Sequence, residues 1–348
     1  MTLLNAIRTG SRYLPWVAFT TCVLSCLFYL FLFLPYHVDD AAIYWRIGQH
    51  LSSSGQYAYN LSGDPFDPSS GTLYVVLAAV FAWLHLEPLF ASKVAGLCFT
   101  VLFSLRAWRV AKEWRVAKEE TACPAHWAFM PAALVILSPY TVIHSVSGLE
   151  TPLFVWLLFE TMVASSRAGR GWRLAVCATL LALTRWEGFL FAAIAIGARA
   201  LFGGETRGRD WMVAGITLAV VTAALLSWRV SYFGDPFPLS FYFKAVNQSG
   251  NSAVHNLFWY FFDRIEWLAA IAIVLVGNGL ARARGLLLNL AWVGAVIAVL
   301  ALYSQGTLEM NFSDRFAFQI LLPVLVFLAT RIEWTRISHP WVMACAVA

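Results

Sequence analysis

Long runs of apolar residues recur along this chain of 348 residues, and they constrain its fold more than any other feature. The first run covers residues 14–34, and a helix of that length can cross the hydrocarbon core of a bilayer, which needs about 20 residues. Only 12% of the residues are charged, whereas about 25% is usual for a soluble domain. Because a backbone inside lipid must satisfy its own hydrogen bonds, the sequence predicts an all-α polytopic membrane protein.

Similar runs follow along the whole chain, and they predict about 10 or 11 transmembrane helices. We see no internal repeat and no low-complexity linker between them, so we expect residues 1–348 to form a single transmembrane domain. The last run is still apolar at Ala348, so the chain either continues beyond this residue or ends in a short buried segment. The expected spans are 14–34, 89–107, 127–143, 149–166, 172–184, 188–203, 211–230, 265–281, 285–303, 316–332 and one that starts near residue 340.

The run 72–86 has only 15 residues, which is short for a span, and its placement decides the orientation of everything after it. Lys and Arg concentrate on the cytoplasmic side of membrane proteins. If this run does not cross, 17 of the 24 Lys and Arg residues lie inside and 7 outside; if it crosses, the numbers become 8 and 16. The sequence therefore predicts a juxtamembrane or re-entrant helix on the outer side, within a first outer loop of residues 35–88.

The formal net charge of +5 does not indicate nucleic-acid binding, because the basic residues form short clusters between apolar runs and not one patch. The six cysteines lie mostly within apolar runs and show neither metal-ligand nor disulfide spacing. We expect them to be small buried residues. No group of side chains has the spacing of a dedicated metal site, so the sequence predicts no metal and no other cofactor.

Asp39 and Asp40 come directly after the first apolar run, at the edge of the membrane. Two neighbouring and partly desolvated carboxylates raise each other's pKa, and one of them can then act as a general base. Alternatively, the pair caps the helix that follows, because an acidic side chain at a helix N-terminus accepts hydrogen bonds from its unpaired N–H groups.

Two polar breaks interrupt later apolar runs on the same outer side. Residues 184–188 contain Arg185 and Glu187, which either form an ion pair in a helical hairpin turn or offer the arginine to a phosphate. Residues 144–150 contain His144 and Glu150 just before a span, where Glu150 either caps the helix or accepts a substrate hydroxyl.

The remaining outer loops carry further charged residues. Lys244 follows a segment rich in aromatic residues and is a candidate contact for a headgroup phosphate. Asp314 and Arg315 stand directly before a span, where they form either an ion pair or another anion site. Ionisable residues near lipid are costly unless they pair or serve a function, so their gathering on one side indicates a site.

The order of these features resembles the GT-C superfamily of membrane glycosyltransferases, and in particular its bacterial terminal arabinofuranosyltransferase branch. Trp186 stands where that branch usually has proline, and the first outer loop of the family contains two juxtamembrane helices. The matching segments are Asp39-Asp40-Ala-Ala-Ile-Tyr, Ser147-Gly-Leu-Glu-Thr, Leu183-Thr-Arg-Trp-Glu-Gly, Tyr232-Phe-Gly-Asp-Pro and Asp314-Arg-Phe.

The resemblance implies an inverting glycosyltransferase that moves a sugar from a polyprenyl-phosphate donor to an extracytoplasmic glycan, lipid or protein acceptor, at the outer face of a bacterial plasma membrane. Asp39 or Asp40 would be the base, and we favour Asp39 because it ends the extended entry to the helix, whereas Asp40 begins the helix. The implied donor-phosphate ligands are Arg185, Lys244 and Arg315, and the implied substrate-binding residues are Tyr44, His144, Glu150, Glu187 and Asp314.

A transporter or flippase is the rival interpretation. Its charged residues would line a path across the membrane, and it would often show inverted repeats. The candidate residues in this sequence gather instead at one face.

Overall fold

The computed structural model describes residues 20–21, 23–117, 128–167, 169, 171–202, 207–240, 242, 283–303 and 312–331. All regular secondary structure in these residues is helical, which confirms the predicted all-α architecture. After an apolar helix at Val23–Phe33, the elements are α2 (Asp40–Ser54), α3 (Thr72–Trp83), α4 (Pro88–Ala117), α5 (Met130–Leu137), α6 (Pro139–Val146), α7 (Thr151–Ser165), α8 (Gly171–Thr184), α9 (Glu187–Phe202), α10 (Arg207–Phe233), α14 (Ala283–Tyr303), η2 (Phe312–Asp314) and α15 (Arg315–Ala329).

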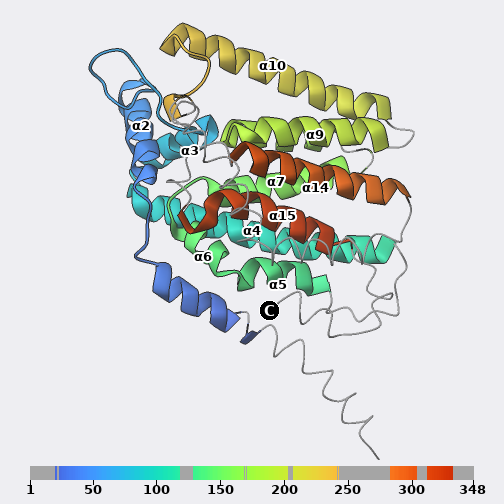
Figure 1. The fold of residues 1–348 in the computed structure, drawn as a ribbon. Coiled ribbons are helices and arrows are strands. Elements are labelled where there is room, and N and C mark those ends of the chain that lie inside the picture. Colours follow the sequence, from blue (N-terminus) through green and yellow to red (C-terminus); the bar gives the residue numbers. More distant parts are fainter. Residues whose placement is uncertain are drawn as a thin grey trace, which may run out of the picture.

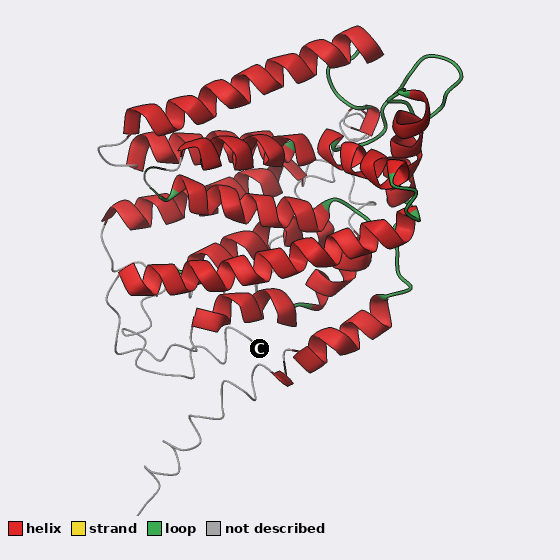
Figure 2. Ribbon diagram, turned by 180° about the vertical axis from the view of Figure 1, so that it is seen from behind, coloured by secondary structure: helices red, strands yellow, loops and turns green. Residues whose placement is uncertain are grey.

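Most of the long helices run side by side, and α2 stands across one end of them (Figure 1). The view from behind shows the same arrangement, with the loop segments that join α2 and α3 gathered at that end (Figure 2). The helices α8, α9 and α15 each pack against α7, and α8 also packs against α9, so α7 lies at the centre of the bundle. Nearly every residue of α7 is buried. These residues are mostly apolar, and the charged one among them, Glu160, pairs with Arg106 and Arg173.

The first outer loop contains two helices, as the resemblance implied. Helix α3 has 12 residues and is thus too short to span, and it packs closely on α2. Gly48 makes this approach possible, since a Cβ at that position would lie 2.8 Å from the Cβ of Ala78. Together α2 and α3 cover the end of the bundle where the polar motifs lie.

Residues 127–143, expected as one span, do not form one continuous helix. The chain breaks at Ser138 (φ −72°, ψ 118°) and forms two helices of eight residues each, α5 and α6. Pro139 is the cause, because proline forces the preceding residue into an extended conformation and then fits the first position of a new helix. Helix α6 also meets α7 at 120°, which brings the residues between them to the end of the bundle.

Two helices are long and apolar enough to cross a membrane alone, Pro88–Arg115 within α4 and Arg209–Phe233 within α10, and the bent pair α6 and α7 gives a third candidate. The other apolar helices in the described parts of the chain are shorter. The bounds of α7, α8, α9, α10, α14 and α15 lie close to those expected, whereas the expected spans 265–281 and beyond 340 fall outside the described residues. The full number of spans stays a prediction.

Candidate active site

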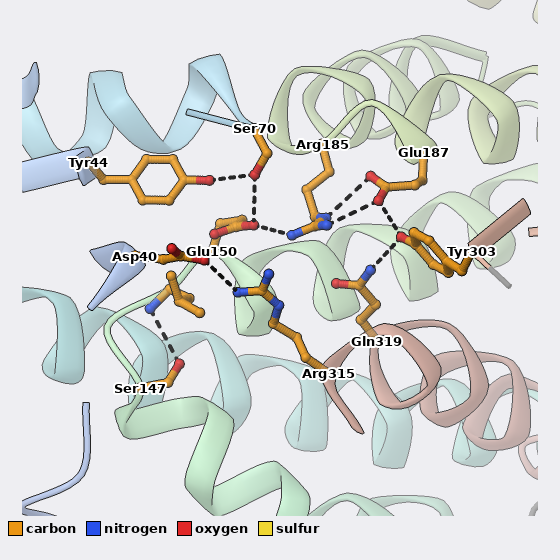
Figure 3. A network of polar contacts seen from close by, with 11 residues as sticks. Asp40, Tyr44, Ser70, Ser147, Glu150, Arg185, Glu187, Tyr303, Arg315 and Gln319 are labelled. Carbon is orange, nitrogen blue, oxygen red and sulfur yellow. Dashed lines mark hydrogen bonds and ion pairs between the residues drawn. The ribbon is translucent and has the colours of Figure 1, made fainter. Parts of the chain in front are cut away.

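A network of polar side chains occupies the end of the bundle beneath α2 and α3 (Figure 3). It draws residues from helix starts and turns that are far apart in the sequence, including the turn before α7, the turn before α9 and the start of α15. Most of the site residues predicted from the sequence lie at these same positions. The structure therefore brings together most of the predicted site residues that it describes.

Arg185 is the most heavily paired residue of the network. Its side chain is 2% exposed, its Nη1 donates to Glu150, and its Nε and Nη2 donate to the carboxylate of Glu187 at 3.3 and 3.0 Å. Of the two roles that the sequence allows for Arg185, the structure shows the ion pair with Glu187. Glu150, which lies 35 residues away in the sequence, also pairs with Arg185. All three guanidinium nitrogens thus point at carboxylates.

Glu150 precedes the first residue of α7, but its side chain makes no capping hydrogen bond, so the interpretation of this residue as a side-chain cap is wrong. Its side chain is 1% exposed, and its Oε1 accepts from Arg185 and, at 3.4 Å, from Ser70 Oγ. Burial alone would raise the pKa of Glu150, but the charges of Arg185 and Arg315 outweigh it and lower that pKa below its ordinary value. The two arginines therefore favour the ionised form of this carboxylate.

Hydrogen bonds extend the network in both directions from Arg185. Tyr44 on α2 shares a hydrogen bond of 2.8 Å with Ser70, and burial together with the charge of Glu150 raises the pKa of Tyr44 well above its usual value. On the other side, Tyr303 donates to Glu187 and accepts from Gln319 Nε2 at 2.8 Å. Ser70, Tyr303 and Gln319 were not among the residues predicted from the sequence, although a glutamine inside an apolar helix was a visible signal.

Arg315 is the second buried arginine of the site and has fewer partners. Its side chain is 4% exposed, its Nη1 lies 3.8 Å from Asp40 Oδ2, and its buried Nε has no hydrogen-bond partner among the described residues. Asp40 is the first residue of α2, and its side chain is 25% exposed. Figure 3 shows Asp40 and Arg315 facing each other beside Glu150.

Asp39 lies outside this network. It is exposed, and its Oδ1 accepts from the backbone N–H of Asp40 at 2.9 Å. Asp39 is thus the N-cap of α2. Helix capping was the alternative to catalysis that the sequence offered for the acidic pair. The two adjacent carboxylates have different surroundings, and only Asp40 meets a cation that belongs to the network.

The turn before Arg315 has an unusual backbone. Ser313 and Asp314 have φ angles of 45° and 55°, in the left-handed region that residues other than glycine rarely adopt. Each such residue costs on the order of 1–3 kcal/mol unless its surroundings compensate. His144 on α6 lies against this turn, with its Nε2 3.0 Å from the carbonyl oxygen of Ser313.

A second buried ion pair anchors the first outer loop. Arg229 on α10 donates to Asp67 at 2.7 Å, and both side chains are 2% exposed. The pair is well supplied with partners, because Arg229 Nε also donates to the carbonyl of Pro236 and Asp67 Oδ1 accepts from the backbone of Ser69. Neither residue was predicted from the sequence, although an arginine in an apolar helix indicates such a pair.

Lys244, a predicted phosphate ligand, lies outside the described residues. The parts of the chain that the structure describes contain no group of three or more His, Cys, Asp or Glu side chains that could hold a metal ion.

No protein-family model matches this sequence, and no curated protein matches it significantly. Among solved structures, the fold is similar to that of ArnT from Cupriavidus metallidurans bound to undecaprenyl phosphate, with a TM-score of 0.60 and 14% sequence identity. The match covers 90% of this chain and 59% of the ArnT chain. This likeness confirms an all-α, ArnT-like fold and, with the apolar helices, supports an integral membrane protein.

Proposed function

We propose that this protein is an inverting glycosyltransferase that transfers a sugar from a polyprenyl-phosphate donor to an acceptor hydroxyl at the outer face of a bacterial plasma membrane. The observation that carries the proposal is the buried guanidinium of Arg315 beside the carboxylate of Asp40. The GT-C-like fold supports it, as does the matched structure, which is of ArnT bound to undecaprenyl phosphate.

Arg315 is the group best suited to the donor phosphate. A buried cation is costly unless it is fully paired, yet Arg315 has one ion pair of 3.8 Å and a buried Nε with no partner among the described residues. A phosphate oxygen would supply the missing partner, and a guanidinium binds phosphate in a bidentate manner. Lys244 is a further ligand in this proposal, as the sequence resemblance implied.

Asp40 is the proposed base, in place of the Asp39 that the sequence analysis favoured. Asp40 faces Arg315, so an acceptor hydroxyl bound between them would lie close to the phosphate-linked sugar. Asp40 would take the hydroxyl proton while the hydroxyl oxygen attacks the anomeric carbon, and the bond from that carbon to the phosphate oxygen would break. Arg315 would stabilise the charge that develops on the leaving polyprenyl phosphate.

Arg185 takes a different role in this proposal. Because its three nitrogens already point at Glu150 and Glu187, it holds the scaffold of the site instead of binding phosphate. Tyr44 supports the same scaffold through Ser70.

Asp314 stands next to Arg315 at the start of α15, where it remains a proposed contact for substrate hydroxyls.

The test is sugar transfer by the purified protein in lipid nanodiscs, with radiolabelled polyprenyl-phosphate sugars as donors and cell-envelope glycan or lipid extracts as acceptors. Asp40→Asn keeps the shape of the side chain but cannot accept a proton, so transfer should fall by about 10²- to 10⁴-fold. Asp39→Asn is the matched control, because asparagine caps a helix as well as aspartate does, and it should retain most of the activity.

Wild-type transfer by Asp40→Asn would overturn the assignment of the base. Movement of a lipid-linked sugar across the bilayer without any transfer would favour a flippase and overturn the proposed reaction.

A further inference from the structure

The turn directly before Arg315 has a backbone conformation that its residues do not favour. Ser313 and Asp314 both have left-handed backbone angles, and neither is glycine. Helix α15 begins at the next residue, so the conformation of this turn sets the direction in which Arg315 leaves the backbone. Such a turn persists only where neighbouring groups hold it, and strained turns of this kind gather at functional sites.

The group that holds this turn comes from another helix. His144 on α6 is 3% exposed, and its Nε2 lies 3.0 Å from the carbonyl oxygen of Ser313. Because a carbonyl can only accept, Nε2 carries the proton in this contact. The imidazole also packs against the ring of Phe318, with 4.7 Å between the ring centroids. His144 is therefore fixed on one side by α15 and bound to the turn that precedes it.

The first outer loop also comes close to this turn. Tyr36 precedes the acidic pair by three residues. Burial raises the pKa of Tyr36, while the nearby charge of Arg315 acts in the opposite direction. The segment that leads to Asp40 therefore passes near Arg315.

We propose that His144 is a positioning residue that locks the turn at Ser313 and Asp314 so that the guanidinium of Arg315 faces Asp40. This inference rests on the proposed function for its consequence in catalysis, and it replaces the direct substrate contact that the sequence resemblance implied for His144. A 3% exposed side chain whose Nε2 is bonded to the backbone has little surface with which to touch a substrate.

The experiment compares His144→Ala with His144→Gln, each alone and combined with Ser313→Gly, in the full-length protein in nanodiscs. Glutamine places an amide donor near the position of Nε2, whereas alanine removes the donor. Glycine adopts left-handed angles without strain, so it should hold the turn even where the histidine bond is missing. Two quantities are measured: the affinity for a polyprenyl phosphate that carries no sugar, and hydrogen exchange of the backbone amides in residues 312–320.

His144→Ala should weaken lipid phosphate binding about tenfold, the scale of one lost hydrogen bond, and should speed amide exchange in residues 312–320. His144→Gln should restore binding to within about threefold of the wild type, and Ser313→Gly should rescue His144→Ala in both measurements. His50→Ala is the matched control, because it removes a similar contact with the carbonyl of Ala58, 2.9 Å from His50 Nδ1, and should leave binding within about twofold.

Equal loss in His144→Gln and His144→Ala, with no rescue by Ser313→Gly, would overturn the positioning role. Hydrogen exchange tests the positioning role independently of lipid binding, so its failure can be distinguished from failure of the proposed function. If the wild type binds no polyprenyl phosphate, the proposed donor is wrong, while faster exchange in His144→Ala and its reversal by Ser313→Gly still decide whether His144 locks the turn.

Discussion

Two turns deliver a buried arginine to the same end of the bundle, and they do so in opposite ways. Arg185, in the turn before α9, has carboxylates at all three of its nitrogens. Arg315, just after the turn that precedes α15, has one ion pair of 3.8 Å and a buried Nε without a hydrogen-bond partner in the described part of the chain. The two side chains are almost equally buried, so exposure does not distinguish them.

This difference in pairing indicates different roles: Arg185 stabilises the scaffold of the site, and Arg315 is available to a ligand. Burying a charged group is compensated only when its hydrogen-bonding groups are paired, and Arg185 meets that condition within the protein. Arg315 does not, and its turn is held in a strained conformation by a residue from another helix. A saturated arginine stabilises the fold, whereas an unsaturated one in a strained turn is the better candidate for a ligand.

The largest effect that this comparison predicts is on stability. Arg185→Ala leaves Glu150 and Glu187 without their shared cation, and breaking a buried ion pair in this way should cost about 3–5 kcal/mol of unfolding free energy. Thermal unfolding in detergent or nanodiscs measures it. Arg46→Ala is the control, because Arg46 is exposed and its hydrogen bonds in the described part of the chain go to Tyr59 and Asn60. A loss of the same size in this control would remove the distinction.

The next effect is on ligand binding. Arg315→Gln should weaken binding of polyprenyl phosphate by about 10- to 100-fold, the scale of a hydrogen bond to a charged group. Its effect on thermal unfolding should be smaller than that of Arg185→Ala, since Asp40 is a quarter exposed and water can solvate it. Native mass spectrometry of lipid binding measures the first quantity. Wild-type affinity in Arg315→Gln would place the phosphate elsewhere.

The smallest effect concerns the edge of the scaffold. Tyr303→Phe removes the hydroxyl that joins Glu187 to Gln319 and should lower the unfolding free energy by about 1 kcal/mol, with little change in lipid phosphate binding. Tyr232→Phe is a suitable control, because the contacts that involve its ring remain. A binding defect in Tyr303→Phe as large as that of Arg315→Gln would show that scaffold and site are not separate.

Much of the fold could be predicted from the sequence because membrane helices are defined by length and apolarity, which are local properties. The ends of α8 and α9 were expected within about two residues, since the polar segment 184–188 marks both. The break at Ser138 was missed because the apolar run continues through Pro139, although proline was the signal for it.

The site was only partly predictable, because its geometry depends on contacts between distant residues. The sequence offered Glu187 as the partner of Arg185 but could not show that Glu150 also pairs with it. It likewise gave no sign that Asp39 and Asp40 have different surroundings, or that His144 bonds to the turn before Arg315. Such facts follow from how α2, α6 and α15 meet in space.

The central claim is that Arg315, and not Arg185, receives the donor phosphate. The most direct measurement is a cryo-electron microscopy structure of the full chain in nanodiscs with polyprenyl phosphate bound. We expect a phosphate oxygen within hydrogen-bond distance of the Arg315 guanidinium, with Arg185 still paired to Glu150 and Glu187. A phosphate bound to Arg185, with either carboxylate displaced and no phosphate oxygen at Arg315, would contradict the account.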